Sequence, residues 1–133
     1  MHLIQKAIIT KGNKYLVLLR SKRASHYPLH WDFPGGKLKP NEEPFAGIAR
    51  EVKEETTLDI KPVKVFDTYE FDLENTGENT HRFTLYSTKL VSDSVRLSDE
   101  HNDFKWALPE EILTLRIQPF LDRFLKDFLD QQE

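Results

Sequence analysis

The chain has 133 residues, a formal net charge of −3 and no cysteine. This length suits a single domain with its own hydrophobic core. The mild charge gives no reason to expect a nucleic-acid partner, and the lack of cysteine excludes a disulfide framework, a thiol nucleophile and a cysteine-based zinc site. No apolar run approaches membrane-spanning length, and residues 1–10 lack a signal-peptide pattern. We therefore expect a cytoplasmic protein without a membrane partner.

The charges are unevenly distributed along the chain. Residues 1–41 contain eight Lys or Arg and one acid, Asp32, whereas the remainder contains eleven basic and 21 acidic residues. A basic first third facing an acidic remainder suits an anionic substrate that is bridged by metal ions. For Lys6, Lys11 and Lys14 taken singly, we expect ordinary surface lysines.

The first predicted elements form a hairpin followed by a basic loop. Residues 3–10 and 15–19 are apolar runs on either side of a Lys-Gly-Asn turn, which predicts two paired strands with the second well buried. In the loop that follows, Arg20 and Arg23 are candidates for contact with an anion, and a solvated loop is an equally good interpretation of each. His26 and His30 have no metal-ligand spacing and stay unassigned.

A glycine turn precedes the strongest helix signal. Residues 33–37 read Phe-Pro-Gly-Gly-Lys, and two glycines let the backbone approach a ligand closely. Lys37 adds a positive charge suited to phosphate. Pro44 is typical of a first helical residue. The apolar residues that follow recur at helical spacing and form one stripe: Phe45, Ile48, Ala49 and Val52.

Three glutamates occupy a different stripe of the same predicted helix. Glu51, Glu54 and Glu55 are spaced so that their carboxylates stand over one turn, where they repel one another. Arg50 can reach Glu54 but cannot neutralise three acids. Clustered carboxylate oxygens suit Mg²⁺ or Mn²⁺. The pattern therefore predicts that these three glutamates are metal ligands.

The spacing of this segment resembles the signature of the Nudix hydrolases, Gly-x5-Glu-x7-Arg-Glu-U-x-Glu-Glu-x-Gly-U, where U is aliphatic. The run from Gly36 through Glu42 and Arg50 to Leu58 matches every fixed position except one, where Thr57 replaces glycine. The preceding Trp-Asp-Phe-Pro of residues 31–34 is also similar to the family, and most similar to its MutT-like branch. The resemblance implies hydrolysis of a nucleoside diphosphate linked to a further group, with Mg²⁺ or Mn²⁺ as cofactor.

Two residues at the helix ends depart from common capping patterns. Glycine often follows a helix because that residue takes a left-handed conformation. With Thr57 there, either the helix ends differently or the threonine is strained. At the other end, Ser or Thr would be a better cap than Glu43. Neither departure removes a predicted metal ligand.

The rest of the chain reads as strands and two helices. Residues 60–73 and 81–90 predict a hairpin with a polar loop that projects into solvent, and residues 97–103 a loop before a last strand ending at Trp106. Pro109 and Pro119 each begin a helix. The apolar stripe of the last helix is core or a dimer surface, so both a monomer and a homodimer are compatible. This order resembles the Nudix α/β/α sandwich with a mixed sheet, as one α/β domain over residues 1–133.

The resemblance and the local chemistry together assign roles. Glu54 or Glu100 is the predicted general base, because the family often brings a further acid from the loop before the last strand; His101 is a weaker alternative. Phosphate is predicted to contact Arg20, Arg23, Gly35, Gly36 and Lys37. Glu42 and Arg50 are predicted to be structural. Four aromatic residues are available for stacking on a base: Tyr27, Trp31, Phe33 and Tyr69. Gln118 is expected to be a helix cap rather than a reader of a base edge.

The predicted activity is MutT-like. We expect Mg²⁺-dependent hydrolysis of a nucleoside triphosphate, an oxidised deoxynucleotide being one candidate, to a monophosphate and pyrophosphate by attack of water. Hydrolysis of ADP-ribose or of a dinucleotide polyphosphate is the alternative. A non-catalytic nucleotide-binding module ranks lower, because the chain retains all three glutamates of the helix.

Overall fold

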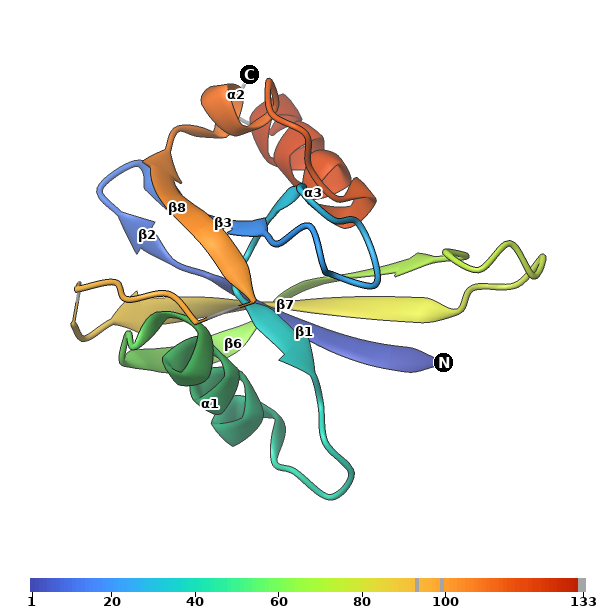
Figure 1. The fold of residues 1–133 in the computed structure, drawn as a ribbon, viewed down its shortest axis with the longest axis horizontal. Coiled ribbons are helices and arrows are strands. Elements are labelled where there is room, and N and C mark those ends of the chain that lie inside the picture. Colours follow the sequence, from blue (N-terminus) through green and yellow to red (C-terminus); the bar gives the residue numbers. More distant parts are fainter. Residues whose placement is uncertain (93, 99, 132–133) are drawn as a thin grey trace.

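The computed structural model describes residues 1–92, 94–98 and 100–131, in which two four-stranded sheets lie between helices (Figure 1). The first sheet has the order β5-β1-β7-β6, and its strands are β1 (His2–Ile8), β5 (Gly35–Lys37), β6 (Ile60–Phe71) and β7 (His81–Leu90). β1 runs parallel to β7 and antiparallel to β5, so this sheet is mixed. The second sheet contains β2 (Thr10–Lys11), β3 (Lys14–Arg20), β4 (Trp31–Asp32) and β8 (His101–Ala107), each of the others antiparallel to β3.

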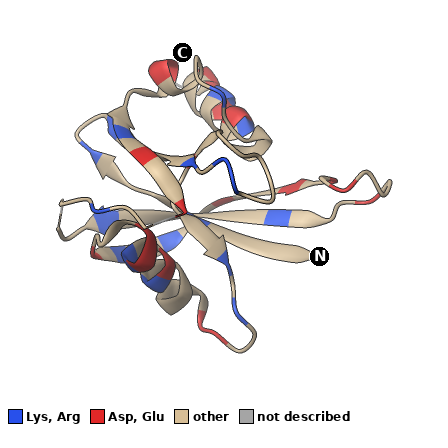
Figure 2. Cartoon of the chain, in the orientation of Figure 1, with Lys and Arg blue, Asp and Glu red and all other residues tan. Residues whose placement is uncertain are grey.

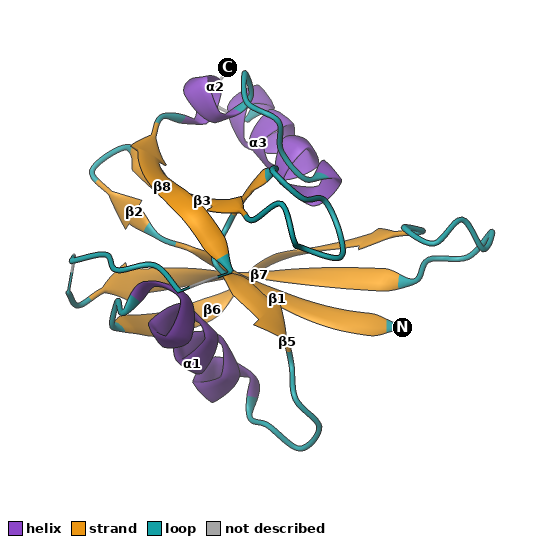
Figure 3. Ribbon diagram, in the orientation of Figure 1, coloured by secondary structure: helices purple, strands orange, loops and turns teal. Residues whose placement is uncertain are grey.

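The helices lie on opposite sides of the strands (Figure 3). They are α1 (Pro44–Thr56), α2 (Pro109–Ile112) and α3 (Pro119–Asp130). α1 covers one side, and α2 and α3 cover the other. This arrangement confirms the predicted α/β/α sandwich with a mixed sheet, although the strands form two sheets rather than one. None of the described helices is long and apolar enough to cross a membrane.

A buried core lies under each helical layer, and β3 contributes to both. Leu16 and Leu18 pack with Ile48 and Val52 of α1, whereas Val17 packs with residues of α3. This alternation follows from the two-residue period of a strand. β3 is therefore buried on both faces, as its continuous apolar run predicted. In α3, the first four residues of the apolar stripe are buried in the core: Phe120, Leu121, Phe124 and Leu125.

The first predicted hairpin is only partly correct. The turn at residues 11–13 forms, with Gly12 at a φ of 61°, but of the strands before the turn only the short β2 pairs with β3. β1 instead lies in the other sheet between β5 and β7. The chain passes from one sheet to the other at Ile9, a buried residue. Pairing between β1 and β7 depends on residues far along the chain, which no local pattern reports.

The ends of α1 explain the two unusual caps. Glu43 does cap the helix, because its carboxylate accepts a hydrogen bond from the Ala46 N–H at 2.8 Å. At the other end Thr57 has a φ of 63°, and its N–H donates to the Lys53 carbonyl at 2.9 Å. Of the two possibilities for the missing glycine, the threonine therefore adopts the left-handed conformation itself.

The β6–β7 hairpin extends well beyond the rest of the molecule at its tip (Figure 1). Asp72 stabilises the loop by accepting hydrogen bonds from the N–H groups of Thr76 and Gly77. The predicted polar, projecting loop is confirmed. His81 at the start of β7 is nevertheless buried.

Candidate active site

A cavity of about 670 Å³ collects residues from the loop after β3, the β5 turn, α1, β7 and the loop before β8. In Figure 2 the basic loop after β3 lies between α3 and the first sheet. All five residues predicted to contact phosphate line this cavity: Arg20, Arg23, Gly35, Gly36 and Lys37. The structure thus brings the basic loop and the glycine turn together around one space.

The glycine turn packs directly on two glutamates of α1. Gly35 has a φ of +147°, and a Cβ atom there would lie 2.0 Å from the backbone oxygen of Gln5. Its N–H donates to Glu55 Oε1 at 2.7 Å. A Cβ atom on Gly36 would lie 2.7 Å from Glu51 Oε2. Glycine is therefore required at position 35 for the close packing of the turn on β1, and a side chain at position 36 would have to displace the Glu51 carboxylate.

Arg50 connects the acidic residues of this region to one another. Its guanidinium donates two hydrogen bonds to Glu42, at 2.6 and 3.0 Å, and one each to Glu51 and Glu54 at 3.1 Å. The bond from Arg50 is the main reason why the pKa of Glu42 falls to about 2. Arg50 and Glu42 do not line the cavity, so their contacts are those of positioning residues.

The three predicted metal ligands do not occupy equivalent places. Glu51 and Glu55 line the cavity, whereas the Glu54 side chain is 58 % exposed and points to Arg50 outside it. Burial raises the pKa of Glu51 above its ordinary value. The structure therefore brings two of the three glutamates to the cavity, and Glu54 would reach an ion there only after releasing Arg50.

Glu100 and His101 meet Glu55 across the cavity. Atoms of these three side chains that could hold a metal ion all lie within 4.8 Å of one another. Burial raises the pKa of Glu55 to about 8 and lowers that of His101 to about 4, so their 3.7 Å contact joins two neutral groups at neutral pH. His101 Nδ1 is buried and has no hydrogen-bond partner among the described residues.

This donor set fits a divalent cation. Carboxylate oxygens are the preferred ligands of Mg²⁺ and Mn²⁺, and the cavity offers those of Glu51, Glu55 and Glu100. The loop before β8 is held in place by its backbone, because the Ser21 N–H donates to the Glu100 carbonyl at 3.1 Å. Asp99, in the same predicted loop, lies outside the described residues.

A buried ion pair behind the cavity was missed by the sequence analysis. Lys6 is 3 % exposed and donates to Asp32 Oδ2 at 2.7 Å and to the Phe33 carbonyl at 3.3 Å. The expectation of a surface lysine is therefore wrong for Lys6, which lines the cavity. Arg20 and Gln118 also donate to Asp32 Oδ2. The one signal in the sequence was Asp32 itself, the only acid of the basic first third.

Gln118 and the aromatic residues also differ from expectation. Gln118 precedes α3, but its side chain makes no capping hydrogen bond and instead lines the cavity. Of the four aromatic candidates for base stacking, Tyr27 lines the cavity, whereas Phe33 and Tyr69 belong to the core. Phe83 and His81 are cavity residues that the sequence analysis did not propose.

Comparison with known proteins identifies the family. Residues 3–128 match the NUDIX domain. A MutT-like protein of Streptomyces ambofaciens is 30% identical over 126 residues, which cover 92% of this chain and 73% of that protein. A crystal structure of the MutT protein from Methanosarcina mazei Go1 matches with a TM-score of 0.83 and 30% identity, covering 98% of this chain and 94% of that one. The chain belongs to the NUDIX family and is a Nudix hydrolase of the MutT-like branch.

Other relatives differ in their substrates. The 8-oxo-dGTP diphosphatase of Proteus vulgaris is 35% identical over 72 residues, 54% of this chain, and the match spans 63% of that protein. The asymmetrical bis(5'-nucleosyl)-tetraphosphatase of Mus musculus is 26% identical over 117 residues, which cover 86% of this chain and 76% of that protein. The chain is thus a pyrophosphohydrolase that acts on nucleoside diphosphate derivatives, and its relatives do not select one substrate.

Proposed function

We propose that this chain hydrolyses a nucleoside triphosphate to a nucleoside monophosphate and pyrophosphate with Mg²⁺ or Mn²⁺, an oxidised deoxynucleotide being one candidate substrate. The observation that carries the proposal is a single cavity with glutamates, basic residues and aromatic residues on its walls. Glu51 and Glu55 suit a cation and Arg20, Arg23 and Lys37 suit phosphates, while Tyr27 and Phe83 can contact a base. The MutT-like relatives support the same choice.

Each group in the cavity has a proposed task. The backbone of Gly35 and Gly36 lets the phosphates approach Glu51 and Glu55, and the basic side chains orient them. We propose the cation ligands Glu51 and Glu55, joined by Glu54 if its side chain turns away from Arg50. When bound, the cation would neutralise phosphate oxygens and lower the pKa of water.

Glu100 is the proposed general base. It lies in the cavity beside Glu55, whereas Glu54 lies outside. Water attacks a phosphorus atom of the α–β bridge, the carboxylate takes its proton, and the bond to the bridging oxygen breaks with its electron pair leaving on the departing phosphate group. Glu42 and Arg50 would keep the α1 carboxylates in position. No covalent intermediate is needed.

A dinucleotide polyphosphate is the second candidate substrate, because the asymmetrical tetraphosphatases of Mus musculus and Caenorhabditis elegans match 86% and 80% of this chain. ADP-ribose hydrolysis stays a further alternative. The organisation as one domain over residues 1–133, a monomeric or homodimeric state and a cytoplasmic location also stay predictions.

Product analysis tests the proposal. The protein is incubated with Mg²⁺ and a panel of nucleoside triphosphates, oxidised triphosphates, dinucleotide polyphosphates and ADP-ribose, and the products are separated and identified. We expect a triphosphate to be the best substrate, giving monophosphate and pyrophosphate in equal amounts. Hydrolysis in ¹⁸O-labelled water then locates the attack, since the label enters pyrophosphate for attack at the β-phosphorus and the monophosphate for attack at the α-phosphorus. Release of orthophosphate, or turnover of another class far above every triphosphate, would contradict the proposal.

A further inference from the structure

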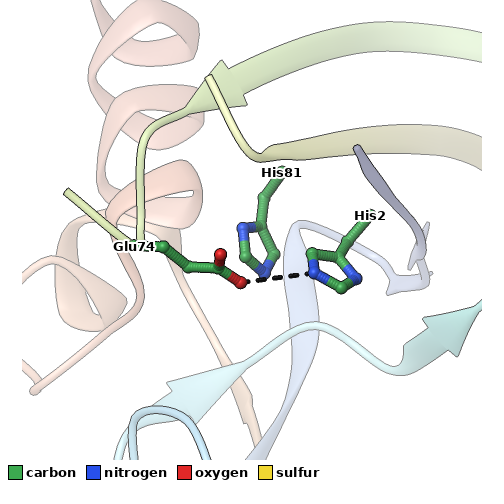
Figure 4. Close-up of side chains that lie close together, drawn as sticks. All are labelled: His2, Glu74 and His81. Carbon is green, nitrogen blue, oxygen red and sulfur yellow. Dashed lines mark ion pairs between the residues drawn. The ribbon is translucent and has the colours of Figure 1, made fainter. Parts of the chain in front are cut away.

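Three side chains from separate segments meet where β1 and β7 begin (Figure 4). They are His2, Glu74 and His81, and their possible ligand atoms all lie within 4.8 Å of one another. His2 Nε2 is 3.3 Å from Glu74 Oε1. None of these residues belongs to the glutamate cluster of α1, so the group needs its own explanation.

The backbone holds the two histidines side by side. His2 and His81 are register partners in the parallel pair β1–β7, and their rings lie 4.6 Å apart with an interplanar angle of 32°. The His2 N–H donates to the Thr80 carbonyl at 2.8 Å, which secures the end of β1. Paired strands therefore fix the separation of the imidazoles.

The ring of His81 is oriented by a hydrogen bond. Its Nδ1 lies 2.8 Å from the Thr80 hydroxyl, and the other ring nitrogen faces Glu74 and His2 (Figure 4). Metal-binding histidines commonly have this arrangement, in which the second nitrogen is held by an oxygen and the first remains for the ion. Thr80 is thus a positioning residue for His81.

The spacing and chemistry of the group suit a transition metal ion. An ion with bonds of about 2.0–2.2 Å in tetrahedral geometry holds neighbouring ligand atoms about 3.4 Å apart, which is close to the distance between His2 and Glu74. These two side chains are 44% and 47% exposed, so they can move the remaining distance toward His81. Two imidazoles and one carboxylate form a known open zinc site, whereas Mg²⁺ prefers oxygen ligands alone.

We propose that His2, Glu74 and His81 bind a Zn²⁺-class ion at a second metal site, distinct from the glutamates of α1. The ion would connect the β6–β7 loop to the first residues of β1 and β7. Because His81 and Leu73 also line the cavity, the ion would fix one of its walls. The competing explanation is an exposed pair between His2 and Glu74 that binds no metal, and such a pair contributes little.

Metal binding in a variant that lacks the first site tests the proposal. A Glu51→Gln/Glu55→Gln protein is equilibrated with Zn²⁺ in excess Mg²⁺, and bound zinc is quantified after dialysis. We expect one equivalent of zinc, and Co²⁺ in its place should give the visible absorption of a four-coordinate site. Adding His2→Gln or Glu74→Gln should weaken zinc binding at least about tenfold, and Thr80→Val should weaken it by about 10-fold through the orientation of His81.

Matched controls separate this site from adventitious binding. Glu78→Gln alters a carboxylate of the same loop, and His30→Gln alters a histidine whose Nδ1 faces the Pro28 carbonyl; neither should change zinc binding. His2 and Glu74 are exposed, so their variants should fold, which circular dichroism checks. The proposal is overturned if the protein without the first site binds no zinc, or if the His2 and Glu74 variants bind it as tightly as their parent.

Discussion

The three glutamates of α1 differ in position, because Glu51 and Glu55 line the cavity and Glu54 does not. Substitution of each one should therefore affect turnover differently. Glu51→Gln and Glu55→Gln each remove a proposed cation ligand from the cavity, so turnover should fall by orders of magnitude with the fold intact. Glu54→Gln should also lower turnover if Glu54 joins the ion on binding. Steady-state kinetics over a range of Mg²⁺ concentrations measures the effects.

Glu110→Gln is the matched control, because Glu110 is an exposed helix acid outside the cavity. Turnover close to that of this control for both Glu51→Gln and Glu55→Gln would refute the site assignment. Wild-type turnover for Glu54→Gln alone would restrict the ligands from α1 to the two carboxylates that line the cavity, Glu51 and Glu55.

Removal of the Lys6 charge should cost substantial stability. Lys6 is buried against Asp32. Lys6→Met removes the ammonium group, so the buried Asp32 carboxylate loses its nearest ion-pair partner and one of its hydrogen-bond donors. Breaking a buried pair in this way costs about 3–5 kcal/mol. Urea denaturation should therefore show a large fall in the free energy of unfolding, and Lys6→Met combined with Asp32→Asn should recover part of it. A loss below about 1 kcal/mol for the single variant would contradict the prediction, since that is the value of an exposed pair.

At the level of elements, the backbone at the C-terminal end of α1 is strained, and substitution can test this strain. A left-handed conformation costs a non-glycine residue about 1–2 kcal/mol, and Thr57 adopts it with a φ of 63°. Thr57→Gly removes this cost but makes the unfolded chain more flexible and loses the hydrogen bond of the Thr57 hydroxyl to the Ser94 carbonyl. We expect a net gain of up to about 1 kcal/mol, measured by thermal or urea unfolding.

Thr56→Gly is the matched comparison for this prediction. Thr56 ends α1 in the buried interior, and its hydroxyl donates to the Val52 carbonyl at 2.7 Å. Glycine there should destabilise the protein, because it loses the hydrogen bond and the packing of the side chain. If both glycine variants are destabilised equally, the strain at Thr57 is not significant.

The elements that local patterns describe were predicted well. Proline positions and apolar spacing located α1, and the strand pair β6–β7 follows from its polar loop. By contrast, the pairing of β1 with β7 and the contact of Asp32 with Gln118 join residues far apart in sequence. Whether a lysine such as Lys6 is buried depends on these distant contacts, so its charge alone suggested a surface position. In the same way, no spacing rule connects His2 with His81.

At the level of the whole molecule, stability without metal should depend on pH through Glu55. Its native pKa of about 8 exceeds the ordinary 4.5, so the native protein retains a proton that the unfolded chain releases. The stabilisation is complete below the ordinary pKa and is lost as pH rises through about 8. The pKa of His101 is lowered from 6.5 to about 4, so below about pH 6.5 the unfolded chain binds a proton that the native chain does not. His101 therefore affects the pH dependence of stability only below about pH 6.5. In EDTA, the melting temperature should therefore fall between about pH 6.5, above which His101 no longer opposes the change, and about pH 8, and should level off at higher pH.

Two comparisons assign this fall to Glu55. Glu55→Gln has no charge to bury, so its melting temperature should fall less over the same range. Adding Mg²⁺ or Mn²⁺ should raise the melting temperature of the wild-type protein. The rise should be larger at high pH, because the Glu55 carboxyl has then already lost the proton that a bound cation would displace. An equal pH dependence in Glu55→Gln and wild type would show that another group is responsible, and a melting temperature insensitive to both ions would contradict the proposed metal site.

The parallel pairing of β1 with β7 has a consequence for synthesis on the ribosome. Gln5 bonds to Tyr86, 81 positions later, so β1 emerges long before its partner exists. Until β7 has left the exit tunnel, the apolar residues of β1 have no completed sheet to join, and His101 and Gln118 reach the cavity later still. Folding of such distant pairs is slow and leaves nascent chains open to aggregation. This protein should therefore depend on chaperones during translation more than its small size suggests.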